Sequence, residues 1–148
     1  MKKTFRAAAL AFAAVIVLAL LCACGEEHEY QLFFSNKTGV KVDSLYFSSS
    51  SIETWGEPVN FAPISVDATI HFDFDSMHVD GNGPGVYDIG AVDENGINYD
   101  VFEVDLAVGD TITLYPQNGD EAVLSVTHAD GTVSDYSGFA YAEGEAAG

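Results

Sequence analysis

The stretch Val66-Asp67-Ala68-Thr69-Ile70-His71-Phe72-Asp73-Phe74-Asp75 decides the fold of this chain. Its apolar residues occupy every second position, and polar residues fill the positions between them. That two-residue period is typical of a β-strand with one buried and one hydrated side. Antiparallel sheets commonly carry such strands, because one face of the sheet packs on the core while the other meets water.

The same alternation recurs along most of the chain. Further strands are predicted at residues 30–34, 40–47, 86–92, 97–106, 111–115, 121–128 and 133–136. A phase shift predicts a bulge near Asp43-Ser44, and Asp93-Glu94-Asn95-Gly96 is typical of a tight hairpin turn. With no amphipathic helical stretch after an N-terminal signal helix, the pattern predicts an all-β fold. The expected form is an antiparallel, immunoglobulin-like β-sandwich of about seven to eight strands. A closed barrel is the alternative, because strand number alone does not separate the two.

The predicted core follows from the inward positions of these strands. Its members are Tyr30, Leu32, Phe34, Ile70, Phe72, Ile89, Phe102, Val104, Ile112 and Leu114.

The N-terminus has the pattern of an export signal. Basic residues at positions 2, 3 and 6 precede an apolar run over residues 7–21, which is too short for a typical membrane-spanning helix. The run ends in Leu21-Cys22-Ala23-Cys24, which resembles the lipobox of bacterial lipoproteins. The resemblance implies cleavage before Cys24, lipid (palmitate) on its thiol, and anchoring at the extracytoplasmic face of the bacterial cell membrane. An ordinary cleaved signal and an uncleaved anchor are the alternatives.

These features divide the chain into four parts. They are a lipoprotein signal peptide at 1–23, a tether at 24–28, a β-sandwich domain at 29–137 and a disordered tail at 138–148, which is rich in Ala, Gly and Glu.

Charge and cysteine content exclude several kinds of function. Only Lys37 and Lys41 of the five basic residues follow Cys24, whereas all 23 acidic residues do, so the exported part carries a net charge of −21. Such a surface repels nucleic acid and anionic lipid, and it favours cations, basic partners or plain solubility. Cys22 and Cys24 are the only cysteines. The exported domain therefore has no thiol for a disulfide, a zinc thiolate or a nucleophile.

A second resemblance rests on short motifs in a fixed order. They are Asn36-x-Thr38-Gly39, Leu45-Tyr46-x-Ser48, Trp55-Gly56, Asp93-Glu94-x-Gly96 and Val104-Asp105-Leu106. Residues 30–115 are thereby similar to a family of small exported bacterial β-sandwich domains. The resemblance implies an extracytoplasmic fold and no established activity. The chain departs from the family pattern at 58–63 and at Gly90, where the family often carries Arg.

Three candidate ligand residues lie together in the sequence. Asp73 and Asp75, with Asp80 in the following loop, are hard oxygen donors of the kind that Ca²⁺ prefers. No acidic loop here fits the EF-hand spacing, however, and a hydrated acidic face explains the same residues. The sequence therefore predicts no metal site beyond these three candidates.

Catalytic patterns are weaker still. The serines at 48–51 lack a nucleophile elbow, and the histidines at 28, 71, 78 and 128 have no triad signature in the sequence. A Ser–His–Asp arrangement in space would favour an enzyme. Trp55, the only tryptophan, is either a plug at the end of the core or an exposed platform for a sugar or peptide, and the plug is the favoured interpretation.

The predicted function is a non-catalytic binding or envelope scaffolding module without a cofactor. Its expected partners are the membrane, reached through the lipid anchor, and a cell-envelope protein or glycan, and the chain is expected to be monomeric. A Ca²⁺-binding module and a small cell-surface hydrolase are the alternatives.

Overall fold

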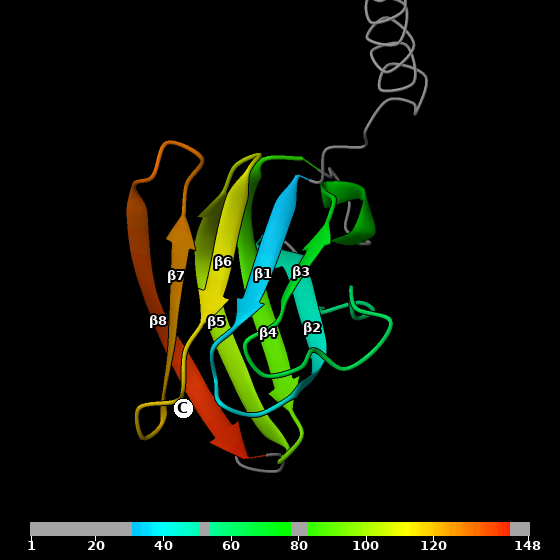
Figure 1. The fold of residues 1–148 in the computed structure, drawn as a ribbon, viewed down its shortest axis with the longest axis vertical. Helices are drawn as coiled ribbons and strands as arrows, with labels where there is room; N and C mark the ends of the chain where they lie inside the picture. Colours follow the sequence, from blue (N-terminus) through cyan, green and yellow to red (C-terminus); the bar gives the residue numbers. More distant parts are fainter. Residues whose placement is uncertain (1–30, 51–53, 78–82, 143–148) are drawn as a thin grey trace, which may run out of the picture.

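The computed structural model describes residues 31–50, 54–77 and 83–142. The described elements are β1 (Leu32–Asn36), β2 (Val42–Ser49), β3 (Thr69–Phe72), the 3₁₀ helix η1 (Phe74–Met77), β4 (Gly85–Asp93), β5 (Ile97–Leu106), β6 (Asp110–Leu114), β7 (Glu121–Thr127) and β8 (Val133–Ala142). The predicted all-β fold and the number of strands are confirmed (Figure 1).

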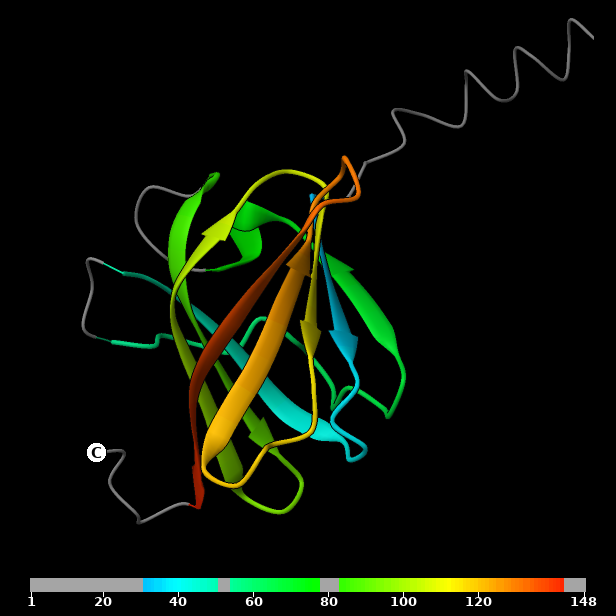
Figure 2. The same cartoon turned by 90° about the vertical axis from the view of Figure 1, so that its left-hand side faces the viewer.

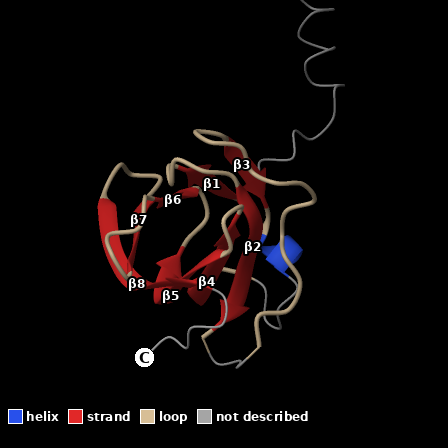
Figure 3. Ribbon diagram, turned by 90° about the horizontal axis from the view of Figure 1, so that it is seen from below, coloured by secondary structure: helices blue, strands red, loops and turns tan. Residues whose placement is uncertain are grey.

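The eight strands form one hydrogen-bonded sheet in the order β2-β4-β5-β8-β7-β6-β1-β3. Seen end-on in Figure 3, the strands follow one another around the core in this order. Every neighbouring pair is antiparallel except β1 and β6, which run parallel. Figure 2 shows the twisted β7–β8 hairpin along one side of this curled sheet.

Curling brings the inward side chains of all the strands into one core. Phe47 of the edge strand β2 and Phe72 of the edge strand β3 meet there, with ring centroids 5.1 Å apart. Of the predicted core, seven members are buried: Leu32, Phe34, Phe72, Ile89, Val104, Ile112 and Leu114. Ile70 is partly buried against the core, and Tyr30 lies outside the described residues.

The predicted bulge near Asp43-Ser44 and the predicted turn at residues 93–96 are both present. The register of β2 against β4 shifts between Val42 and Ser44. The Asp93–Gly96 turn closes through a hydrogen bond from the Gly96 N–H to the Asp93 carbonyl, and Gly96 has a φ of 78°, which glycine adopts without strain.

The strand at residues 66–75 is much shorter than the alternation predicts. Asp67 has a φ of 62°, and its N–H bonds to the Asn36 carbonyl, so the chain turns there and β3 begins only at Thr69. After Phe72 the chain enters η1, which places Phe74 in the core at 2% exposure. A turn can place an apolar residue inward as well as a strand can, and alternation alone does not distinguish them.

Among the described members of the predicted core, Phe102 alone points outward, with 45% exposure. Tyr87 pairs with Val104 and Ile89 with Val101, so Phe102 and Glu103 together stand opposite the single residue Asp88. This is a β-bulge, in which Glu103 has a φ of 56°. The bulge reverses the side on which Phe102 would otherwise lie.

The predicted disordered tail begins too early. β8 continues through residues 138–142, and Asp100 of β5 pairs with Phe139. A Cβ atom on Gly138 would overlap the backbone carbonyl of Asp100, so only glycine permits this close crossing.

Among the described residues, no helix has the length and apolar character needed to cross a membrane.

Candidate functional site

The candidate site lies on the outer face of β2, β4, β5 and β8. Because side chains alternate along a strand, the neighbours of the buried residues Phe47, Ile89 and Val101 project away from the core. Several of these outward residues are polar or aromatic, which gives this face a mixed chemistry.

Trp55 covers this face from the loop after β2. A Cβ atom built on Gly90 of β4 would lie 3.2 Å from both Cη2 and Cζ3 of the indole, so the ring rests directly on the glycine backbone. Trp55 is half-buried and is not part of the core cluster. The favoured prediction of a core plug is therefore wrong, because the absence of a side chain at Gly90 leaves room for the ring outside the sheet.

Two pockets flank the indole ring, each with a volume of about 350 Å³. Both include Trp55 and Asp100 in their walls. The first is completed by Ser48, Ser50, Thr54, Asp88 and Phe102, and the second by Tyr46, Gly90, Ala91, Val92, Asn98 and Tyr141. Volumes of this size suit a small molecule or a single side chain of a larger ligand.

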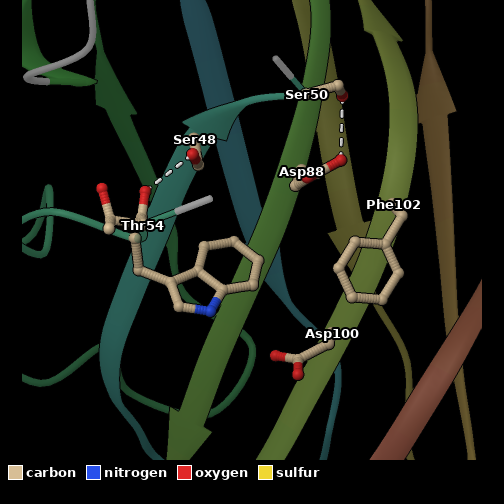
Figure 4. Close-up of a pocket in the computed structure, with 7 residues that line it drawn as sticks. Ser48, Ser50, Thr54, Asp88, Asp100 and Phe102 are labelled. Atoms are coloured by element: carbon tan, nitrogen blue, oxygen red, sulfur yellow. Dashed lines mark hydrogen bonds between the residues drawn. The ribbon is translucent and has the colours of Figure 1, made fainter. Parts of the chain in front are cut away.

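The loop that carries Trp55 is tied to the sheet through its backbone. Ser48 Oγ donates to the Thr54 carbonyl at 2.8 Å, and Ser50 Oγ donates to Asp88 Oδ1 at 2.8 Å (Figure 4). The same Asp88 oxygen accepts the Glu103 N–H at 3.0 Å. Asp88 thus holds both the loop after β2 and the β5 bulge, which is a structural role.

A line of aromatic rings extends from the indole across the sheet. The Phe102 centroid lies 6.4 Å from that of Trp55, and the Phe139 centroid lies 6.3 Å from that of Phe102. Phe102 and Phe139 are 45% and 47% exposed, which is unusual for side chains of this size. Neighbouring exposed rings form an apolar strip next to the two pockets.

Asp100 is the most enclosed charged group of the site, with 9% exposure. Its Oδ2 accepts a hydrogen bond from the Tyr141 hydroxyl at 2.6 Å. Burial raises the pKa of Asp100, and the hydrogen bond from Tyr141 partly opposes that rise. The hydrogen bond to Asp100, together with burial, raises the pKa of Tyr141 to about 12.

A second constellation lies where β6, β7 and β8 meet. His128 Nδ1 is 3.0 Å from Asp110 Oδ1, and His128 Nε2 is 2.9 Å from Ser134 Oγ. Asp110 is 1% exposed, and its Oδ2 accepts the Ala107 N–H at 2.8 Å. The three side chains have the connectivity of a Ser–His–Asp triad, in which the carboxylate orients the imidazole toward the hydroxyl.

The three candidate metal ligands are not brought together by the described structure. Asp73 lies just after β3, where its Oδ1 accepts the Gln31 N–H at 3.1 Å, and Asp75 is exposed within η1. Asp80 lies outside the described residues, as does Cys24. Within residues 31–50, 54–77 and 83–142, no group of three or more His, Cys, Asp or Glu side chains is arranged to hold a metal ion.

Several residues of the site are missed by the sequence patterns. Asp100 stands at an ordinary hydrated position of a strand, and Tyr141 falls within the predicted tail. Asp110, His128 and Ser134 belong to different strands or turns, so their meeting depends on the order of β6, β7 and β8. Gly90 was the one available signal, as a glycine within a strand often marks a close approach.

Comparisons with protein-family models, with curated proteins and with solved structures find no match to this chain.

Proposed function

We propose that this chain is a lipid-anchored, extracytoplasmic binding module whose ligand lies against Trp55. The observation that carries the proposal is the indole ring on Gly90 with a pocket of about 350 Å³ on either side. An aromatic face beside hydroxyl, amide and carboxylate groups is the usual composition of a site for a sugar ring or a peptide side chain. The anchor itself rests on the Leu21–Cys24 pattern.

The site offers both kinds of contact that such a ligand needs. The aromatic rings bury apolar surface, while Asn98, Asp100 and Tyr141 line the second pocket with hydrogen-bonding groups. Loop residues over a rigid sheet commonly carry binding in β proteins, because the sheet fixes the geometry and the loop supplies the contacts. Cell-envelope glycans and proteins are the ligands that the predicted location would present.

The test uses cells that make either the wild-type protein or Trp55→Ala, with chemical crosslinking before extraction. We expect the wild type to crosslink to a defined envelope component that Trp55→Ala loses. Phe61→Ala is the matched control, because Phe61 is also aromatic, belongs to the same connection between β2 and β3, and is fully exposed. Equal crosslinking by all three proteins would refute a ligand at Trp55.

Hydrolysis of an acyl ester by Ser134 is a second candidate function, favoured by the Asp110–His128–Ser134 hydrogen bonds. In this reaction His128 Nε2 takes the hydroxyl proton of Ser134 as Oγ bonds to the acyl carbon, and the leaving alcohol then takes that proton. Water subsequently releases the acid and restores the serine.

A fluorophosphonate probe separates this candidate from a purely structural role for the three side chains. Covalent labelling that Ser134→Ala abolishes and Ser137→Ala retains would support the hydrolase, since Ser137 is an exposed serine of the same strand. Absence of labelling in the folded wild-type protein would reject it. The hydrogen bonds would then serve to join β6 to the β7–β8 hairpin.

A further inference from the structure

The ligand class at Trp55 follows from the surroundings of Asp100, whose carboxylate belongs to both pockets. Its Oδ2 is occupied by the Tyr141 hydroxyl, while its Oδ1 has no hydrogen-bond partner among the described residues. Figure 4 shows the Asp100 carboxylate projecting into the first pocket, on the same side of the sheet as Phe102. An acceptor oxygen therefore remains open at the floor of the site.

In the part of the chain that the structure describes, no positive side chain pairs with this carboxylate. The described residues that line the two pockets include no lysine, arginine or histidine. Lys37 pairs instead with Asp67 at 3.3 Å, at an exposed position. A carboxylate withdrawn from water without a cation is costly, and a ligand that brings one recovers part of that cost.

The aromatic groups around the carboxylate favour the same kind of ligand. The faces of Trp, Tyr and Phe attract cations electrostatically, and the attraction is strongest for Trp. Trp55 and Phe102 stand beside Asp100 in the first pocket, and Trp55 and Tyr141 stand beside it in the second. A cation beside this carboxylate is attracted both by the negative charge of Asp100 and by the faces of the neighbouring aromatic rings.

We infer that the ligand at Trp55 presents an organic cation with N–H donors, a primary ammonium or a guanidinium, to Asp100 Oδ1 and the aromatic rings around it. The inference rests on the proposed binding function and names the chemistry of its ligand. The exported part, with a net charge of −21, also draws such cations toward the surface. The cation is supplied either by a basic side chain of an envelope protein or by a small free amine.

The single tryptophan reports on the site directly. Its emission is followed in the intact protein while N-acetyl-lysine amide, N-acetyl-arginine amide or the uncharged isostere N-acetyl-norleucine amide is added. We expect the lysine or arginine amide to bind about tenfold or more tightly than the norleucine amide. A charge-assisted hydrogen bond contributes a difference in affinity of this size. A free alkylamine distinguishes the two sources, because it binds as well as the amides only if the cation alone is recognised. Tetramethylammonium, which lacks N–H donors, should bind more weakly than either basic amide.

Two variants of equal charge provide the control. Asp100→Asn should lose the preference for the basic probes, while Asp105→Asn, an exposed carboxylate on the same strand, should keep it. Equal effects of the two substitutions would reduce the preference to general surface charge and overturn the inference.

The outcome also separates this inference from the proposed function. The norleucine amide binding both wild type and Asp100→Asn as tightly as the basic amides do would reject a cationic ligand. Trp55 would then remain a binding site for an uncharged ligand. If Trp55→Ala retains its envelope crosslinks, the binding site at Trp55 itself is rejected.

Discussion

Replacing Gly90 by valine should displace Trp55 without unfolding the protein. An alanine Cβ at this position already lies 3.2 Å from two indole carbons and 3.4 Å from a third, a few tenths of an ångström inside comfortable packing. Valine adds two methyl groups toward the ring, and the ring cannot remain where it is. Overpacking costs about 1–3 kcal/mol when the neighbours are fixed. Here the neighbour is a ring on a loop whose adjacent residues are exposed, so the cost falls at the lower end.

The strand itself gains from the same substitution. Glycine is unfavourable in a strand and valine is favourable, by up to about 1 kcal/mol. The two effects nearly cancel, so the free energy of unfolding should change by no more than about 1 kcal/mol. Because Trp55 is the only tryptophan, its emission should shift to longer wavelength and acrylamide should quench it more strongly.

Urea unfolding and the emission spectrum together check this reasoning. Gly90→Ala should give a smaller shift than Gly90→Val, and Phe61→Ala should give none. A loss of about 3 kcal/mol or more with an unchanged spectrum would refute the placement of Trp55, since that combination is typical of a position that faces the core.

Three further predictions address the core, the acid and the anchor. Phe72→Ala should cost about 3–5 kcal/mol of unfolding free energy in urea, because Phe72 is buried at 6% exposure, while the fully exposed Phe61→Ala should cost almost nothing. Burial raises the pKa of Asp100 in the folded state, so the folded protein holds this proton more tightly than the unfolded chain does. The associated stability is present below the unfolded pKa and is lost as pH rises through the folded one. Asp100→Asn should therefore gain stability relative to wild type as pH rises through the folded-state pKa, in urea unfolding curves taken from acid to neutral pH. A stability difference that does not change with pH would contradict the burial of this carboxylate. Cys24→Ala should leave the detergent phase on phase separation whereas Cys22→Ala stays in it, and retention of both would argue against lipidation at Cys24.

The fold class was predictable because alternation is a direct consequence of strand geometry. Leu32, Phe34, Ile112 and Leu114 lie inward as their period requires. The departures occur where the backbone leaves the regular period. The bulge at Glu103 turns Phe102 outward. The carboxylate that accepts the Glu103 N–H belongs to Asp88 on the neighbouring strand, which local sequence patterns around Glu103 do not include.

The candidate site was less predictable for a related reason. Its tryptophan is visible in the sequence, but the surface on which it rests is set by the pairing of β2, β4, β5 and β8. Asp100 joins the candidate site only because Tyr141 of β8 donates a hydrogen bond to it and Trp55 lines the same two pockets. Local patterns describe each strand, whereas the site depends on which strands become neighbours.

The parallel pairing of β1 with β6 has a consequence for the order in which the protein assembles. Leu32 is paired with Asp110 and Asn36 with Leu114, so the first strand of the sheet takes a partner from far along the chain. Contacts of this kind slow folding, because a long loop must close before they form. In a chain that emerges from its N-terminus, β1 is able to pair early with β3 but must keep its other edge open, with Phe34 poorly covered, until β6 appears. The strand closest to the proposed anchor is thus the first to emerge, yet its pairing is completed only when the sixth strand has been made.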